Sequence, residues 1–140
     1  MYYRTVAFVA TNDAHIGLFV EPSLEASMYE IVLGGWGNTK SAIRKSSQGS
    51  NVVEVDGAIC DPDEYVTVTV SIVNGDTIRV ALGDDPNANI FMTWEDPVPH
   101  WKVNYIAVMT GWGSTGLWQL DEVEEPREIP EKPFNDDLCL

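Results

Sequence analysis

Hydrophobic and polar residues alternate one by one along much of the chain. The clearest stretch is residues 65–73, where aliphatic side chains fall on one face of an extended chain and hydroxyl side chains on the other: Val66, Val68, Val70 and Ile72 against Thr67, Thr69 and Ser71. A period of two is typical of an antiparallel strand with one buried and one exposed face. The pattern therefore predicts a half-buried strand at 65–73.

Turn residues separate this strand from several similar segments. Asn74-Gly75 stands between residues 65–73 and the alternating run 77–82, which is a strong signal for a β-hairpin. Only residues 22–28 have a helical composition, and they are too few to form a stable helix. About ten strands are predicted, at residues 2–10, 15–20, 29–33, 39–45, 52–55, 65–73, 77–82, 90–94, 101–110 and 115–120.

The fold class follows from this series of short strands. Short strands at regular spacing, divided by turns, are typical of a β-sandwich or barrel. The chain has 140 residues, of which 44% are hydrophobic, and this is enough for one domain with its own core. We predict an all-β fold: an antiparallel β-sandwich, jelly-roll-like in outline, over residues 1–120.

The last twenty residues have a different composition. Residues 121–140 contain eight acidic residues, two basic residues and three prolines, with few apolar side chains. Such a segment cannot bury enough apolar surface to fold by itself. It is predicted to be an extended acidic tail outside the sandwich.

The charge balance narrows the choice of partners. With 22 acidic and eight basic residues, the chain has a net charge of −14. This charge repels phosphate backbones and anionic membrane surfaces, so we expect neither nucleic acid nor membrane insertion. The longest uncharged stretch, residues 103–120, is too polar for a membrane span. The sequence does not decide the compartment, with secretion slightly favoured over the cytoplasm.

Cysteine and histidine are too few for a metal or disulfide framework. Cys60 and Cys139 are the two cysteines, and Cys139 could either link two subunits or remain an exposed thiol. Asp13 and His15 would face the same side of a strand, as an acid–base pair or half of a metal site. We favour an Asx turn followed by a strand histidine, because no nucleophile or further ligand accompanies them. His100 is predicted to lie in a loop, and neither metal nor cofactor is expected.

A near-repeat carries the most specific chemistry. Gly34-Gly35-Trp36-Gly37-Asn38-Thr39 is echoed by Gly111-Trp112-Gly113-Ser114-Thr115. A tryptophan between glycines has no bulky neighbours, so its ring can form a flat platform on which a sugar stacks. Nearby groups would bond the sugar hydroxyls: Asp13, Asn38, Ser114 and Thr115. The alternative is that both indoles are buried in the core, where they pack at the corners of the sheets.

A short basic segment follows the first of these turns. Residues 38–45 hold three of the eight basic residues. Lys40 and Arg44 could bind a carboxylate, a sulfate or an acidic sugar, or could balance nearby acidic residues.

Three segments in order resemble the domain named after farnesoic acid O-methyltransferase. They are residues 13–18, beginning Asp13-Ala14-His15, the stretch from Tyr29 to Arg44, and residues 110–118 around Gly111-Trp112-Gly113. The resemblance covers residues 3–120 and implies a small β domain. The chain has no glycine-rich strand–turn–helix unit of the kind that binds S-adenosylmethionine, so we expect no methyltransferase activity.

These observations favour a lectin: a non-enzymatic protein that binds glycans and gains avidity as a homo-oligomer. A structural or protein-interaction module that uses the acidic tail is the second hypothesis. An enzyme acting on an isoprenoid acid is the third.

Overall fold

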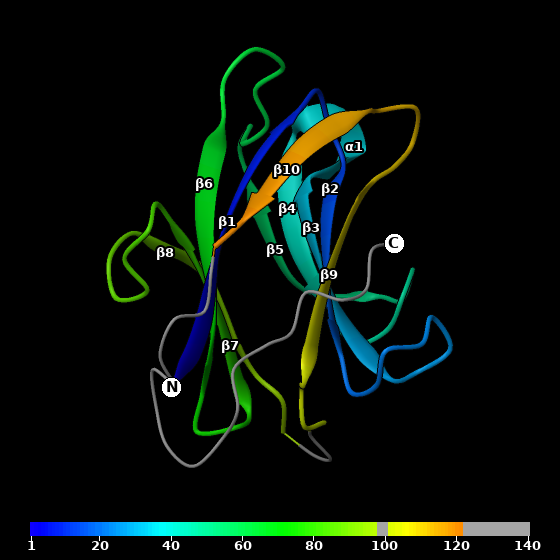
Figure 1. The fold of residues 1–140 in the computed structure, drawn as a ribbon, viewed down its shortest axis with the longest axis vertical. Coiled ribbons are helices and arrows are strands. Elements are labelled where there is room, and N and C mark those ends of the chain that lie inside the picture. Colours follow the sequence, from blue (N-terminus) through cyan, green and yellow to red (C-terminus); the bar gives the residue numbers. More distant parts are fainter. Residues whose placement is uncertain (98–100, 122–140) are drawn as a thin grey trace.

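The computed structural model describes residues 1–97 and 101–121. Ten strands form two five-stranded antiparallel sheets that pack face to face (Figure 1). Sheet A has the strand order β10-β1-β6-β7-β8, and sheet B has the order β5-β4-β3-β2-β9. The predicted all-β sandwich is confirmed. Within it, β2 to β5 and β6 to β8 are local meanders, and the chain crosses between the sheets at four other connections.

The strand boundaries follow the alternating pattern closely. The largest difference is in β9, which was predicted from residue 101 but begins at Tyr105, because the preceding loop makes other bonds. Trp101 N donates to Tyr29 Oη at 2.9 Å, and Asn104 N donates to Phe19 O at 2.9 Å. The strands are β1 (Tyr2–Ala10), β2 (Ala14–Phe19), β3 (Met28–Gly34), β4 (Lys40–Arg44), β5 (Asn51–Asp56), β6 (Val66–Val73), β7 (Thr77–Leu82), β8 (Ile90–Glu95), β9 (Tyr105–Thr110) and β10 (Gly116–Leu120).

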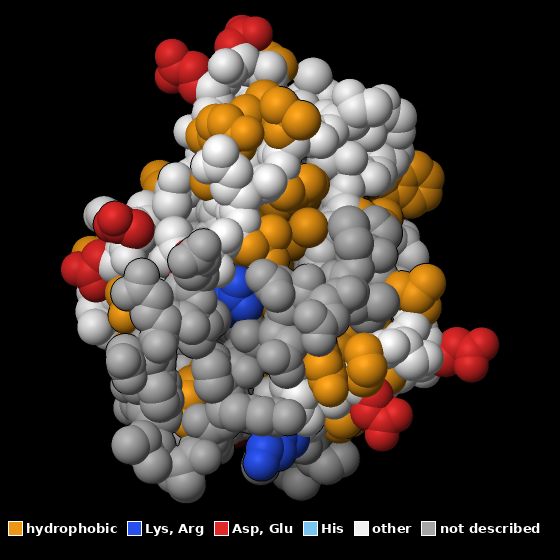
Figure 2. Space-filling model, in the orientation of Figure 1, with side chains coloured by type: hydrophobic (Ala, Val, Ile, Leu, Met, Phe, Trp, Pro, Cys, Tyr) orange, Lys and Arg blue, Asp and Glu red, His pale blue; other side chains and the backbone are white. Residues whose placement is uncertain are grey.

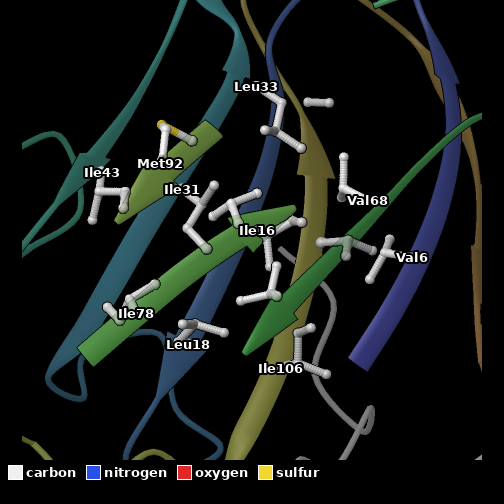
Figure 3. Packing of buried hydrophobic residues seen from close by; sticks show 14 of the residues in the cluster. Val6, Ile16, Leu18, Ile31, Leu33, Ile43, Val68, Ile78, Met92 and Ile106 are labelled. Carbon is white, nitrogen blue, oxygen red and sulfur yellow. The ribbon is translucent and has the colours of Figure 1, made fainter. Parts of the chain in front are cut away.

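The core lies between the sheets and is almost entirely aliphatic. Alternate residues of each strand point inward, so side chains of the two sheets face one another (Figure 3). Burial of each such side chain contributes roughly 1.5–3 kcal/mol before the cost of conformational entropy. The labelled residues of sheet B are Ile16, Leu18, Ile31, Leu33, Ile43 and Ile106, and those of sheet A are Val6, Val68, Ile78 and Met92.

The outer face of sheet A is more buried than its polar residues predict. Thr69 and Ser71 of β6 share the face opposite Val68 and Val70, as the alternation indicated, but both are buried. The half-buried prediction for this strand is therefore wrong at these two positions. The chain after β7 folds over β6, where Thr69 Oγ1 donates to Gly83 O at 2.7 Å.

The outer face of sheet B is also covered, and it carries charge. Strands β2 and β3 are buried along their whole length, including His15 and Glu30 on the face that points away from the core. Buried charged groups in a strand require partners, and clusters of such groups are common at functional sites.

Helical structure is limited to one short turn in the described residues. Element α1 (Gly35–Asn38) connects β3 to β4, and Trp36 and Gly37 within it have left-handed backbone conformations. Residues 22–26 form bends and turns, and Met28 begins β3. In the part of the chain at 1–97 and 101–121, no helix is long and apolar enough to cross a membrane. His100, Cys139 and the predicted tail after Asp121 lie outside the described residues, and the predictions about them stay predictions.

Candidate functional site

The two Gly-Trp-Gly turns lie at the same end of the sandwich. In Figure 1, α1 and the connection from β9 to β10 both stand at the top of the molecule. The turn between β1 and β2 joins them: Asp13 N donates to Gly34 O at 2.9 Å, and Gly111 N donates to Asp13 O at 3.0 Å. Asp13, in the turn between β1 and β2, therefore forms backbone hydrogen bonds with both tryptophan turns.

A cavity of about 500 Å³ opens between these turns on the outer face of sheet B. Trp36 and Trp112 are 43% and 74% exposed, so neither ring is buried in the core. Both indoles border the same cavity, whose lining is Asn12, Asp13, His15, Val32, Trp36, Gly37, Arg44, Gln48 and Trp112.

Unusual backbone conformations hold the rings in place. Asp13, Trp36, Asn38 and Trp112 have φ values of 52°, 53°, 63° and 52°. Positive φ costs a non-glycine residue about 1–2 kcal/mol, because Cβ approaches the following carbonyl oxygen. Three of these residues line the cavity and Asn38 lies in the same turn as Trp36, so neighbouring contacts must offset the strain of all four.

Asn38 supplies the strongest of these contacts for the first turn. Its Oδ1 accepts hydrogen bonds from Ile59 N at 3.1 Å and Cys60 N at 2.9 Å, and its Nδ2 donates to Cys60 O at 3.0 Å. Gly34 leaves room for this arrangement, because a Cβ there would lie 2.5 Å from Asn38 Oδ1 and 2.5 Å from Cys60 Sγ. The turn is thus clamped onto the connection between β5 and β6.

The cavity floor is built on a buried chain of alternating charges. His15 Nε2 lies 3.2 Å from Asp13 Oδ1, and His15 Nδ1 lies 3.4 Å from Glu30 Oε2. Glu30 Oε1 accepts a 2.8 Å hydrogen bond from Arg44 Nη1 and a 3.2 Å bond from Gln48 N. Both imidazole nitrogens face carboxylates, which suits the imidazolium form because only that form donates from both nitrogens.

The titration of His15 and Glu30 reflects this pairing. Burial by itself would lower the pKa of His15, but the hydrogen bonds to Glu30 and Asp13 outweigh it and raise that pKa above its ordinary value. Burial would raise the pKa of Glu30, yet the bonds from His15, Arg44 and Gln48 N lower it. The pairing therefore favours the charged forms of both His15 and Glu30.

Two cations lie against the Trp36 ring. Lys40 Nζ is 4.9 Å and Arg44 Cζ is 5.4 Å from the ring centroid, within the range of a cation–π interaction. Lys40 also pairs with Glu54 at 3.7 Å. The ring is thus exposed but fixed by charged neighbours.

The eight residues predicted for ligand binding divide into two groups. Asp13, Trp36, Arg44 and Trp112 line the cavity, whereas the other four do not: Asn38, Lys40, Ser114 and Thr115. Ser114 Oγ lies 3.1 Å from Thr11 Oγ1 and fastens the second turn to the β1–β2 turn. Thr115 lines a separate hollow beside Val9 and Pro62.

Sequence reasoning missed Glu30, Asn12 and Gln48, and treated His15 as an isolated strand residue. A single acid within the apolar run of β3 was the available signal for Glu30, because a charge in a buried strand needs a partner. Asn12 and Gln48 lie in turns and carry no comparable signal. Among the residues that the structure describes, no cluster of histidine, cysteine, aspartate and glutamate is placed to hold a metal ion.

The comparisons with known proteins agree with the resemblance noted in the sequence. No curated protein matches the chain. The family model described as farnesoic acid O-methyl transferase matches residues 2–124, which include every residue that lines the cavity. The chain therefore belongs to the farnesoic acid O-methyl transferase family.

Proposed function

We propose that the protein is a lectin that binds a carbohydrate in the cavity between Trp36 and Trp112. The observation that carries the proposal is that two exposed indoles, from turns 76 positions apart in the sequence, border one cavity. Single exposed apolar side chains are ordinary, but two aromatic rings that border one cavity are typical of a binding site.

The size and lining of the cavity suit a small sugar. A volume of about 500 Å³ is within the usual range of small-ligand sites. The C–H faces of a pyranose ring would stack on an indole, while polar groups at the margin bond its hydroxyls. Asn12, Arg44 and Gln48 place an amide, a guanidinium and a second amide around the two rings.

We further propose that binding is not accompanied by catalysis. His15 is the side chain at the cavity best suited to move a proton, but it is fully buried and both its nitrogens face carboxylates. A general base must reach the proton that it abstracts. The family's name describes a methyl transfer, for which neither sheet offers the parallel strand–turn–helix unit of common S-adenosylmethionine enzymes.

Avidity would come from self-association. A single shallow sugar site commonly binds with dissociation constants of about 1 mM to 1 μM. Pairing two sites in a homo-oligomer raises the apparent affinity without new contacts to the sugar. We therefore expect the active form to contain more than one copy of the chain.

A glycan array followed by calorimetric titration tests the proposal. Trp36→Ala and Trp112→Ala are each expected to weaken binding at least about tenfold, because each removes a stacking surface. Leu24→Ala is the matched control, since Leu24 is 65% exposed and lies in the β2–β3 connection outside the cavity. An array without any bound glycan, on a sample shown to be oligomeric, would contradict the proposal.

A further inference from the structure

The cavity offers a ligand more hydrogen-bond donors than acceptors. The acidic side chains at its floor have already used their oxygens within the protein. Asp13 Oδ1 faces His15 and Asp13 Oδ2 accepts from Asn12 Nδ2 at 2.7 Å. Both oxygens of Glu30 are occupied as well, by His15, Arg44 and the backbone of Gln48. The carboxylates therefore have little capacity left to accept bonds from a ligand.

Donors remain available at the same place. Arg44 uses Nη1 on Glu30 and Nε on Asn51, and within the described part of the chain no hydrogen bond uses its Nη2. Gln48 is exposed at the cavity, where its side-chain amide adds two donor N–H groups and one acceptor oxygen. The indole N–H groups of Trp36 and Trp112 can only donate. A cavity with many donors and few acceptors favours a ligand group that only accepts.

The local charge points in the same direction. Lys40 and Arg44 lie over Trp36, in a protein whose net charge is −14. Among the described side chains, the acidic ones visible in Figure 2 lie at the margins of that face. An anion is repelled by the protein as a whole, so it would bind only where cations are held, as Arg44 is held by Glu30 and Asn51.

We propose that the cavity selects sugars that carry a carboxylate, with Arg44 as the residue that receives it. This inference rests on the proposed function and names the class of ligand. A carboxylate accepts charge-assisted hydrogen bonds from guanidinium N–H groups, and within the described residues the two N–H groups of Arg44 Nη2 are not used by another bond. Arg44 lines the cavity, so its Nη2 would receive the carboxylate while the indoles hold the sugar ring.

The test varies the ligand first. The full chain is titrated with methyl glycosides of the gluco, galacto and manno series, each in three forms: the neutral sugar, the uronic acid and the uronamide. The uronamide has the shape of the acid without its charge. We expect the acid to bind about tenfold more tightly than the other two forms in at least one series, as a charge-assisted hydrogen bond implies.

The outcomes separate the two proposals. Equal binding of acid, amide and neutral sugar would overturn the carboxylate inference and leave the lectin proposal standing. Tighter binding of a 6-sulfated sugar than of any uronic acid would also overturn it. No binding of any form, with an empty glycan array, would overturn the lectin proposal itself.

A protein variant assigns the role to Arg44. Arg44→Lys keeps the charge but not the guanidinium N–H groups, so the ratio of acid to amide affinity should fall to less than about threefold, whatever the change in the affinity for neutral sugars. Arg79→Lys is the control, because Arg79 lies on β7 of sheet A, away from the cavity. Retention of the full acid preference in Arg44→Lys would overturn the assignment. The ligand series does not depend on how well this variant folds.

Discussion

Two clusters of the molecule contain the same kinds of side chain, but one borders the cavity and the other is closed. Beside the cavity, Glu30 pairs with Arg44, and Arg44 lies over the exposed Trp36. In the second cluster, Lys45 pairs with Asp96 at 2.8 Å and lies 5.1 Å from the centre of the Trp101 ring. Each cluster therefore combines a buried carboxylate, a cation and an indole.

The difference between them lies in how the aromatic rings are used. In the second cluster Tyr29 donates to Asp96 Oδ2 at 2.7 Å, and its ring packs 4.9 Å from Trp101 and 6.1 Å from Trp94. The rings fill the space between them. None of Tyr29, Trp94 or Trp101 has a positive φ, whereas Trp36 and Trp112 both do. The comparison teaches that the backbone, more than the composition, decides whether an indole closes a core or borders a cavity.

The largest effect is expected from breaking the charge chain under the cavity. Glu30→Gln leaves Arg44 and His15 without a buried counter-charge and should lower the free energy of unfolding by about 3 kcal/mol. Chemical denaturation measures the loss, and titration of the folded fraction should show weakened sugar binding. A variant with wild-type stability would show that the chain of charges is not a structural unit.

The equivalent change in the closed cluster should affect stability alone. Asp96→Asn removes the charge that faces Lys45 and weakens the acceptor of Tyr29, and we expect a loss of about 2 kcal/mol. Lys45 is partly exposed, so the effect is smaller than for Glu30. Sugar binding, measured below the melting temperature, should not change. A loss of binding similar to that of Glu30→Gln would break the distinction between the two clusters.

A pH series sharpens the comparison further. The raised pKa of His15 means that its contribution to stability is complete below 6.5 and is lost as the pH rises through the folded pKa. The lowered pKa of Glu30 means that its contribution is complete above 4.5 and is lost as the pH falls through the folded pKa. The groups that face His15 are Asp13 and Glu30, with Arg44 beyond Glu30.

The contribution of His15 and Glu30 to the free energy of unfolding should therefore be greatest between about pH 4.5 and 6.5. His15→Gln should flatten the decline above pH 6.5. Asp96→Asn serves as the control, because it should leave that decline in place. A decline unchanged by His15→Gln would assign the dependence to another group.

The smallest effect is expected at the backbone of the second turn. Trp112→Gly and Trp112→Ala both remove the ring, but glycine adopts a φ of 52° without strain. We expect Trp112→Gly to be more stable than Trp112→Ala by about 1 kcal/mol, although both should bind sugar more weakly than the unchanged protein. Thermal unfolding of the two variants measures the difference. Equal stability would indicate that the turn relaxes once the ring is gone.

The sequence predicted the sandwich because strand geometry imposes a period of two on the side chains. Residues 65–73 and 77–82 alternate clearly, and both form strands. Asp13 and His15, which strand alternation predicted to face the same side, do lie 3.2 Å apart, but Asp13 precedes β2 and has a positive φ. Local periodicity is enough for these features because each depends on neighbours in the sequence.

The cavity could be predicted only in part. Trp36 and Trp112 were identified from their glycine neighbours, but the closure of the outer face of sheet B depends on contacts between distant turns. Asn38 was predicted to bind ligand, yet its side chain clamps Ile59 and Cys60, residues about twenty positions away. No local pattern distinguishes an amide that bonds a sugar from one that bonds a distant backbone.

The peptide of Asp13 has a consequence for the range of ligands. Its N–H and C=O connect the Trp36 turn to the Trp112 turn, so the gap between the two rings is set by a single residue. Lengthening the β1–β2 connection by one residue would shift that gap while leaving the two sheets intact. Relatives that differ in the length of this connection would then bind ligands of different width. Changing that length is a simple way to redesign the selectivity of the site.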